Sequence, residues 1–151
     1  MGADKHEKER RRERLSPFVP VLIDTLDQPA WKAMSFGARA LYIALKRRYS
    51  LHYRNNGRIF LSQRDAVTEL ASHHTQIARW FRELQHFGFI VLTKAAVLGL
   101  EGKGQAPRWR LTELGYMRDP PTKDYARWDG SPFVNKIKPR ARKPARPVPE
   151  I

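Results

Sequence analysis

The sequence predicts a mainly α-helical fold that carries a small β-hairpin, which places the chain in the α+β class. Two observations support this class. Apolar residues recur with helical spacing in three segments between residues 35 and 87. Two short runs of strand composition, residues 89–94 and 108–112, follow them and are separated by a loop with three glycines and one proline. With 151 residues, 41% of them hydrophobic, the chain is long enough for one domain with a core.

The first predicted helix lies in SFGARALYIALKRRY, residues 35–49, with Ser35 as a suitable N-cap. The Asn-Asn-Gly turn at residues 55–57 precedes a short apolar run that we expect to be the first strand. The apolar face of the helix is formed by Ala38, Leu41, Leu45 and Tyr49.

The second predicted helix begins near Gln63, because Ser62 and Asp65 have the spacing of a capping box. In such a box the serine oxygen accepts from a first-turn amide and the carboxylate reaches back to the serine amide. The helix should end by Ala71, since Ser72 is a good cap for a new helix. Its apolar face consists of Ala66, Val67 and Leu70.

The third predicted helix starts at Ser72 and ends near Phe87, where Gly88 supplies the left-handed residue that closes a helix. Ile77, Phe81 and Leu84 form its apolar stripe, with Trp80 and Phe87 beside it. We expect Trp80 to pack in the core or at a dimer contact rather than on a ligand. The opposite, exposed face is expected to hold His73, Gln76, Arg79 and Glu83.

The order helix, strand, helix, helix, strand, loop, strand is that of a winged helix-turn-helix domain, and Lys103 lies in the loop that forms the wing. The predicted organisation has four parts. Residues 1–14 form a charged arm expected to be disordered, residues 15–117 the winged-helix domain, residues 118–133 an extension docked through Tyr125 and Trp128, and residues 134–151 a basic, proline-rich disordered tail.

Five short patterns carry a resemblance to a known group of proteins. They are PAW at residues 29–31, S-x-x-A-R-x-L-Y at 35–42, NNG at 55–57, GFI at 88–90 and WRLT at 109–112. Between about Phe18 and Trp128 the chain resembles small bacterial and prophage winged-helix proteins, which are similar to the DNA-binding domains of phage and plasmid replication initiators. The resemblance implies a winged-helix fold and DNA as the partner. If the chain is an initiator, we expect it to depart from the fuller ones in having no second globular domain.

The net charge of +14 independently favours a polyanionic partner. Half of it, +7, falls on residues 15–133, where it can form a surface, and +5 falls on residues 134–151. The basic residues of the tail can contact phosphate without reading sequence.

In a winged helix the second helix of the pair lies in the major groove and the wing reaches the backbone. Gln76 can pair with adenine and Arg79 with guanine, each through two hydrogen bonds. The residues expected to face bases are His73, His74, Thr75, Gln76 and Arg79. Those expected at phosphates or in the wing are Ser62, Arg64, Arg82, Lys94 and Lys103.

Other chemistries find little support in the sequence. The chain has no cysteine, and the adjacent His73 and His74 have no third ligand at a useful spacing, so we expect no metal. The GLEGKG loop lacks the spacing of a phosphate-binding loop, and no carboxylate pair suggests catalysis. We therefore expect no enzyme activity, no cofactor and no small-molecule substrate. No segment is long and apolar enough for a membrane span, so the expected location is the bacterial cytoplasm, associated with the nucleoid.

Two functions remain open at this point. The first is a sequence-specific double-stranded DNA-binding protein, a transcriptional regulator or replication accessory of a bacterial mobile element such as a prophage or plasmid. The second is an adaptor whose winged helix binds a protein or structured RNA while the tail adds unspecific charge. The polar start of the third helix favours the first, because a protein-docking surface is more often apolar. A homodimer fits many DNA-binding proteins, but no long apolar strip outside the core specifies one.

Overall fold

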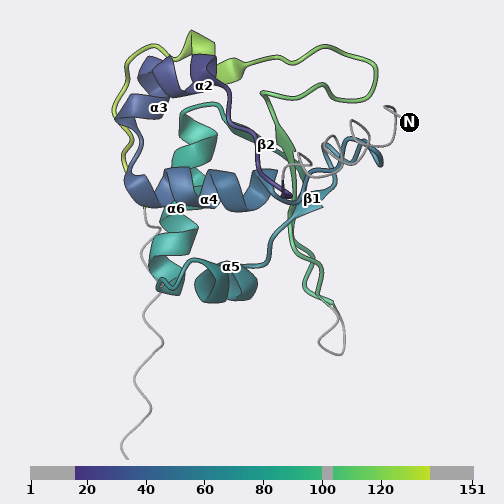
Figure 1. Ribbon diagram of the computed structural model, residues 1–151. Helices are drawn as coiled ribbons and strands as arrows, with labels where there is room; N and C mark the ends of the chain where they lie inside the picture. Colours follow the sequence, from purple (N-terminus) through teal and green to yellow (C-terminus); the bar gives the residue numbers. More distant parts are fainter. Residues whose placement is uncertain (1–15, 100–103, 137–151) are drawn as a thin grey trace, which may run out of the picture.

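The computed structural model describes residues 16–99 and 104–136 of the chain (Figure 1). The expected arm and most of the expected tail lie outside these residues, as does Lys103. In the described part the helices are α2 (Ile23–Asp27), α3 (Pro29–Ala33), α4 (Phe36–Lys46), α5 (Gln63–Glu69) and α6 (His74–His86), with a short 3-10 helix η2 (Asp124–Arg127). The strands are β1 (Ile59–Phe60), β2 (Ile90–Lys94) and β3 (Arg108–Leu111).

The three strands form one antiparallel sheet in the order β1-β3-β2, which confirms the predicted α+β class. β3 is the central strand, with Ile59 opposite Trp109 on one side and Ile90 opposite Leu111 on the other. The side chains of Trp109 and Leu111 are buried while Arg108 and Arg110 are only half-buried, as the alternation of a strand requires.

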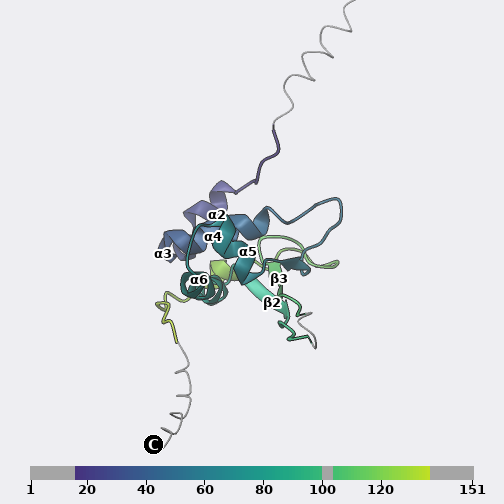
Figure 2. The same ribbon diagram turned by 90° about the horizontal axis from the view of Figure 1, so that it is seen from below.

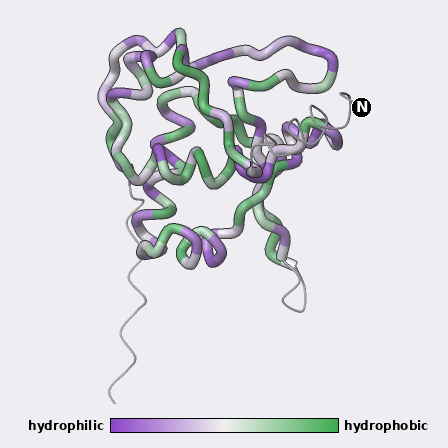
Figure 3. The backbone as a smooth tube through the Cα atoms, in the orientation of Figure 1, coloured by the Kyte–Doolittle hydropathy of each residue, from purple (hydrophilic) through white to green (hydrophobic). Residues whose placement is uncertain are grey.

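The helices pack on one side of this sheet. In Figure 1, α4 crosses α6, and α5 lies at the N-terminal end of α6. Hydrophilic and hydrophobic residues alternate along these helices (Figure 3), and the predicted stripe of Ile77, Phe81 and Leu84 is buried. Viewed from below, the β2–β3 hairpin projects away from the helices (Figure 2). At the start of α6, the side chains of His74, Thr75 and Gln76 are exposed.

An aromatic cluster forms the centre of the core. The ring of Phe89 makes edge contacts with Trp31 and Tyr42, at centroid distances of 5.7 and 5.4 Å, and stacks on Tyr125 at 4.6 Å. Tyr125 is fully buried and Trp128 packs on Phe87, so the predicted docking of these two residues is confirmed. Such aromatic pairs stabilise a core beyond the area they bury.

The helices α2 and α3 were not predicted. Each has five residues, which is too short for an apolar period to be read, and only Pro29 at the first position of α3 marks a helix start. The predicted cap of α4 is confirmed, because the Ser35 hydroxyl accepts from the Ala38 amide. The helix ends at Lys46, however, and Tyr49 lies beyond it. There Arg48 and Tyr49 make tighter bonds to carbonyls three residues back, as is common at helix ends.

Asn56 lies in the predicted Asn-Asn-Gly turn. Its side-chain amide makes hydrogen bonds to the end of β3 of the kind that a backbone peptide group would make. Its Oδ1 accepts from the Leu111 amide at 2.8 Å, and its Nδ2 donates to the Leu111 carbonyl at 3.0 Å and the Gly115 carbonyl at 2.9 Å. Gly57 follows at φ +86°. The Asn56 side chain thereby holds the α4–β1 loop to the central strand.

A buried polar cluster joins α2, α4 and the chain after β3. Glu113 accepts hydrogen bonds from Thr25 Oγ1 at 2.9 Å, Tyr42 OH at 2.5 Å and Lys46 Nζ at 2.7 Å. Burial acts to raise the pKa of Glu113, but these bonds and the Lys46 charge outweigh it, so the pKa lies below its ordinary value. Burial, together with the Glu113 charge, raises the pKa of Tyr42 well above its ordinary value. Every charge in this cluster has a partner, which indicates a structural role.

None of the described helices is long and apolar enough to cross a membrane.

Candidate nucleic-acid interface

The turn between α5 and α6 differs by one residue from the prediction. α6 begins at His74 and its N-cap is His73, whose Nδ1 accepts from the Thr75 amide at 3.4 Å, so Ser72 is not the cap. The reason lies in the end of α5. Ala71 adopts φ +47°, and the Ser72 amide donates to the Val67 carbonyl at 3.2 Å, which closes α5 in a Schellman motif. Ser72 therefore belongs to the end of α5.

All five residues expected to face bases are exposed. The imidazole rings of His73 and His74 lie 4.1 Å apart, and His73 Nδ1 is 2.9 Å from the Thr75 hydroxyl. Gln76 occupies the first turn of α6, and Arg79 the second. The exposed start of α6 thus presents imidazole, hydroxyl, amide and guanidinium groups, which can donate or accept hydrogen bonds at base edges.

Glu83 was expected on this exposed face, and that prediction is wrong. Its side chain is only 3% exposed, and its carboxylate accepts from the Ser35 amide at 2.5 Å and the Ser35 hydroxyl at 2.8 Å. A carboxylate at a helix N-terminus satisfies free amides and is favoured by the helix dipole. The negative charge of Glu83 is consequently used inside the fold, between α6 and α4.

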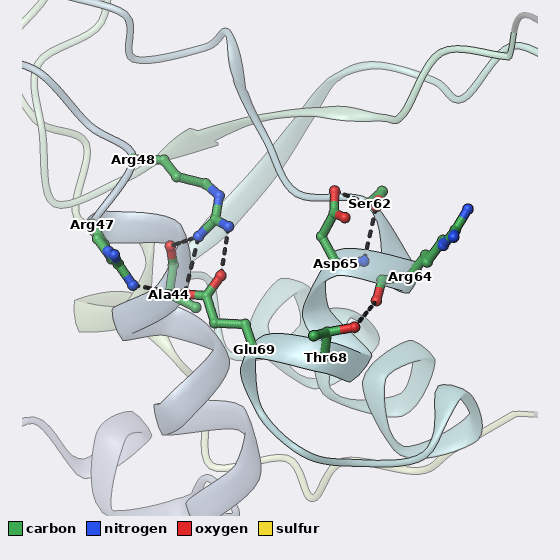
Figure 4. Close-up of polar contacts among 8 residues, drawn as sticks. All are labelled: Ala44, Arg47, Arg48, Ser62, Arg64, Asp65, Thr68 and Glu69. Atoms are coloured by element: carbon green, nitrogen blue, oxygen red, sulfur yellow. Dashed lines mark hydrogen bonds and ion pairs between the residues drawn. The ribbon is translucent and has the colours of Figure 1, made fainter.

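The start of α5 is ordered by its cap. The Ser62 hydroxyl accepts from the Asp65 amide at 3.0 Å, as predicted. The carboxylate of Asp65 accepts from the Ser62 hydroxyl at 2.7 Å, whereas the expected bond was to the Ser62 amide. Arg64 is exposed and points away from these contacts (Figure 4). Arg64 is therefore available to an anion beside the start of α5.

Glu69, the remaining acidic residue of α5, ties this helix to the end of α4. Arg48 donates to both of its carboxylate oxygens, at 2.5 and 3.2 Å, and Arg47 lies 3.7 Å away (Figure 4). The hydrogen bonds from Arg48 hold the pKa of Glu69 below its usual value. This pair joins α5 to the residues that directly follow α4.

The acidic residues of α5 and α6 therefore all have structural partners. Asp65 pairs with its own cap, Glu69 with Arg48, and Glu83 with Ser35. Within residues 16–99 and 104–136, no carboxylate pairs with the exposed Arg64, Arg79 or Arg82. The exposed face of the two helices is consequently positive.

Arg82 contacts a segment that was not expected to reach it. Its Nε donates to Asn135 Oδ1 at 3.0 Å, and the guanidinium of Arg79 lies 6.0 Å from the ring of Phe133. The docked extension thus continues two residues past the expected boundary at residue 133. Both arginines remain exposed beside it.

The hairpin supplies the other positive groups. Lys94 is exposed at the end of β2, and its Nζ donates to Gln105 Oε1 at 3.3 Å. Arg108, which the sequence prediction missed, lies at the start of β3. The alternation in the segment RWRL was the signal that could have found it. Arg108 lines a hollow of about 400 Å³ between the hairpin and the start of α5, together with Phe60, Ser62, Gly104, Gln105 and Ala106.

Trp80 packs against α4, as predicted for a core residue. A Cβ atom at Gly37 would lie 1.9 Å from the Trp80 ring, so the glycine is what allows the two helices to approach. In the described residues no group of three or more His, Cys, Asp or Glu side chains is arranged to hold a metal ion.

Comparison with known proteins gives no match: no family model fits the chain, and neither a curated protein nor a solved structure resembles it significantly.

Proposed function

We propose that the chain is a sequence-specific, double-stranded DNA-binding protein built on a winged helix. The arrangement supports this fold: α4, α5 and α6 pack together, α5 and α6 are joined by a tight turn, and a β-hairpin follows α6. In such a domain α6 enters the major groove and the β2–β3 hairpin contacts the backbone.

The observation that carries the proposal is the distribution of charge on α5 and α6. Their acidic side chains serve caps and helix contacts, whereas Arg64, Arg79 and Arg82 are exposed. A surface that binds the phosphates and bases of DNA needs this separation, because a free carboxylate there would repel phosphate. Gln76 and Arg79 would read bases, and Arg64, Lys94 and Arg108 would contact phosphates.

The biological setting that fits best is regulation of transcription, or assistance to replication, in a bacterial mobile element. A dimer would select a palindromic site, whereas an initiator would select direct repeats. Selection of bound sequences from a random duplex pool, with the full chain, distinguishes these two cases.

The decisive experiment compares Arg79→Ala and Gln76→Ala with Arg118→Ala, which removes an exposed arginine from the loop after β3. On the selected duplex, each of the first two substitutions should weaken binding by about tenfold or more, as expected for loss of a bidentate base contact. On random duplex their effect should be below about threefold, and Arg118→Ala should change neither. Equal losses on both duplexes, or a pool that yields no motif, would contradict sequence-specific binding and favour an adaptor that docks protein or RNA.

A further inference from the structure

The face of the sheet that points away from the helices carries an exposed aromatic side chain. In β1, Ile59 belongs to the core with 1% of its surface exposed, whereas Phe60 beside it is 58% exposed. Successive side chains of a strand point to opposite faces, so Phe60 lies on the face that the helices do not cover. A large apolar ring in such a position is a candidate for contact with a partner.

Arginines surround Phe60 on this face. Arg108 is its direct partner in the pairing of β1 with β3, and Arg110 lies on the same face because it is two residues further along β3. Arg58 lines a hollow together with Phe60. In the part of the chain that the structure describes, none of these three arginines forms an ion pair with a carboxylate. We call Phe60, Arg58, Arg108 and Arg110 the outer sheet face.

Phe60 lines two separate hollows. The first, of about 400 Å³, is the one that Arg108 shares between the hairpin and the start of α5. The second has a volume of about 380 Å³ and is also lined by Arg48, Arg58 and Asp65. A cavity of about 150 Å³ can hold a benzene ring, so each hollow has room for a planar ring beside Phe60.

The charge in these hollows is positive. Asp65 is the acidic residue among those that line them, and its carboxylate accepts from the Ser62 hydroxyl at 2.7 Å (Figure 4). Arg48 is engaged by Glu69, but Arg58 and Arg108 have no such partner among the described residues. Each guanidinium carries five N–H donors, so Arg58 and Arg108 can donate to an anion beside Phe60.

We propose that the outer sheet face binds single-stranded nucleic acid, with one base stacked on Phe60 and the neighbouring phosphates held by Arg58 and Arg108. Aromatic side chains for stacking, set in a positive groove that follows the backbone, are what binding of a single strand requires. The bases of a duplex are stacked on one another and out of reach of such a ring. This activity is additional to duplex binding by α6, and either can hold without the other.

The test measures binding of the full chain to fluorescein-labelled oligothymidylate and oligouridylate by fluorescence anisotropy. Strands of about 20 nucleotides are longer than one binding site of this kind. Three variants change the ring: Phe60→Ala removes it, Phe60→Leu keeps an apolar side chain without a π face, and Phe60→Trp keeps an aromatic one. Phe36→Ala is the matched control, because Phe36 is 84% exposed at the start of α4, away from the sheet.

Phe60→Ala and Phe60→Leu should each weaken binding by about tenfold, the loss expected when one stacked base loses its aromatic partner. Phe60→Trp should bind at least as well as wild type, and Phe36→Ala should differ from wild type by less than about twofold. The strand that wild type binds more tightly identifies DNA or RNA as the source of the ligand.

The charged part of the site has its own readout. Over a series of KCl concentrations, Arg58→Ala should lower the magnitude of the salt slope by about 0.7, the value for one phosphate contact on a single strand. Lys32→Ala, which removes an exposed positive charge from α3, should leave the slope unchanged.

Three results would overturn the inference. Wild type could bind neither strand, or Phe60→Leu could bind as well as Phe60→Trp, which would mean that no base stacks on the ring. Phe60→Ala could also weaken binding to the selected duplex as much as to the single strand, which would make the outer sheet face part of the duplex site. The proposed function is tested separately, since Arg79→Ala should weaken duplex binding and leave single-strand binding within about twofold of wild type.

Discussion

Glu83 of α6 accepts two hydrogen bonds from Ser35, one from its amide at 2.5 Å and one from its hydroxyl at 2.8 Å, and so caps α4 from a neighbouring helix. The two residues are 48 positions apart in the chain. Their contact fixes how α4 crosses α6, and hence how the exposed face of α6 is oriented relative to the rest of the domain.

Glu83→Ala should lower the free energy of unfolding by about 1 to 3 kcal/mol, because it leaves two partly buried donors of Ser35 without their charged partner. Glu83→Gln should cost about half as much, since the amide oxygen can still accept one of these bonds. Urea denaturation followed by circular dichroism measures both. A loss below about 0.5 kcal/mol for Glu83→Ala would mean that the carboxylate does not cap α4 in solution.

Ala71→Gly should stabilise the domain by about 1 kcal/mol. Ala71 adopts φ +47°, which costs an L-residue energy that glycine does not pay. The matched control is Ala40→Gly, at an exposed position inside α4, which should destabilise by about 1 kcal/mol. Thermal unfolding of the two variants should therefore shift in opposite directions, and shifts of the same sign would contradict the left-handed turn between α5 and α6.

Gly37→Ala should destabilise the domain by about 1 to 3 kcal/mol, although alanine is normally the better helix former. The added methyl group would lie 1.9 Å from the Trp80 ring, which must move away from α4. In a Trp80→Val background the same change should cost little or become favourable. A double-mutant cycle by chemical denaturation checks this coupling, and additive effects would exclude the contact.

Stability should fall at both ends of the pH range because of the Glu113 cluster. The pKa of Glu113 is lowered in the folded state. Its contribution to the stability of the fold is therefore present above its unfolded-state pKa of about 4.3, and it is lost as the pH falls through the folded-state pKa. The pKa of Tyr42 is raised in the folded state. Its contribution to the stability of the fold is therefore present below its unfolded-state pKa of about 10, and it is lost as the pH rises through the folded-state pKa. Denaturation midpoints measured from pH 3 to 11 test both limbs. In Tyr42→Phe the alkaline limb should become shallower, and an unchanged alkaline limb would contradict this assignment.

Glu113→Gln should cost about 3 kcal/mol at neutral pH, because it leaves the buried Lys46 ammonium without its counter-charge. Replacing both residues, as Lys46→Met with Glu113→Leu, should recover much of this loss, since no unpaired charge then remains. Urea denaturation of the single and double variants measures the recovery. A double variant no more stable than Glu113→Gln would show that the ion pair is not the source of the cost.

The sequence predicted the structure correctly where the pattern involves residues close together in the chain. The caps at Ser35 and Ser62, the apolar stripe of α6 and the glycine that ends it depend on residues a few positions apart, and these predictions are confirmed. The predicted position of the α6 cap is wrong by one residue, because two competing patterns overlap there. Ser72 can cap a helix, but the end of α5 uses its amide first.

The burial of Glu83 could not be predicted, because its partner Ser35 comes from another helix and a charged residue with helical spacing is normally exposed. The contact of Asn135 with Arg82 was missed for the same reason, since it joins segments 53 residues apart. Of the candidate site, the exposed residue types on α6 were accessible from the sequence. The sequence did not show which of these residues contact other parts of the chain.

The Asn56 side chain has a chemical consequence for the lifetime of the molecule. An asparagine followed by glycine is the sequence most prone to deamidation, in which the glycine amide attacks the side-chain carbonyl carbon. Here that side chain is held by hydrogen bonds to Leu111 and Gly115, and the Gly57 amide donates to its Oδ1 at 3.2 Å, so rearrangement for the attack requires these bonds to break. Conversion to aspartate would set a carboxylate against carbonyl oxygens and release the loop from β3. The fold therefore protects Asn56 from deamidation. Chains that have spent time unfolded would keep the aspartate that forms at this position.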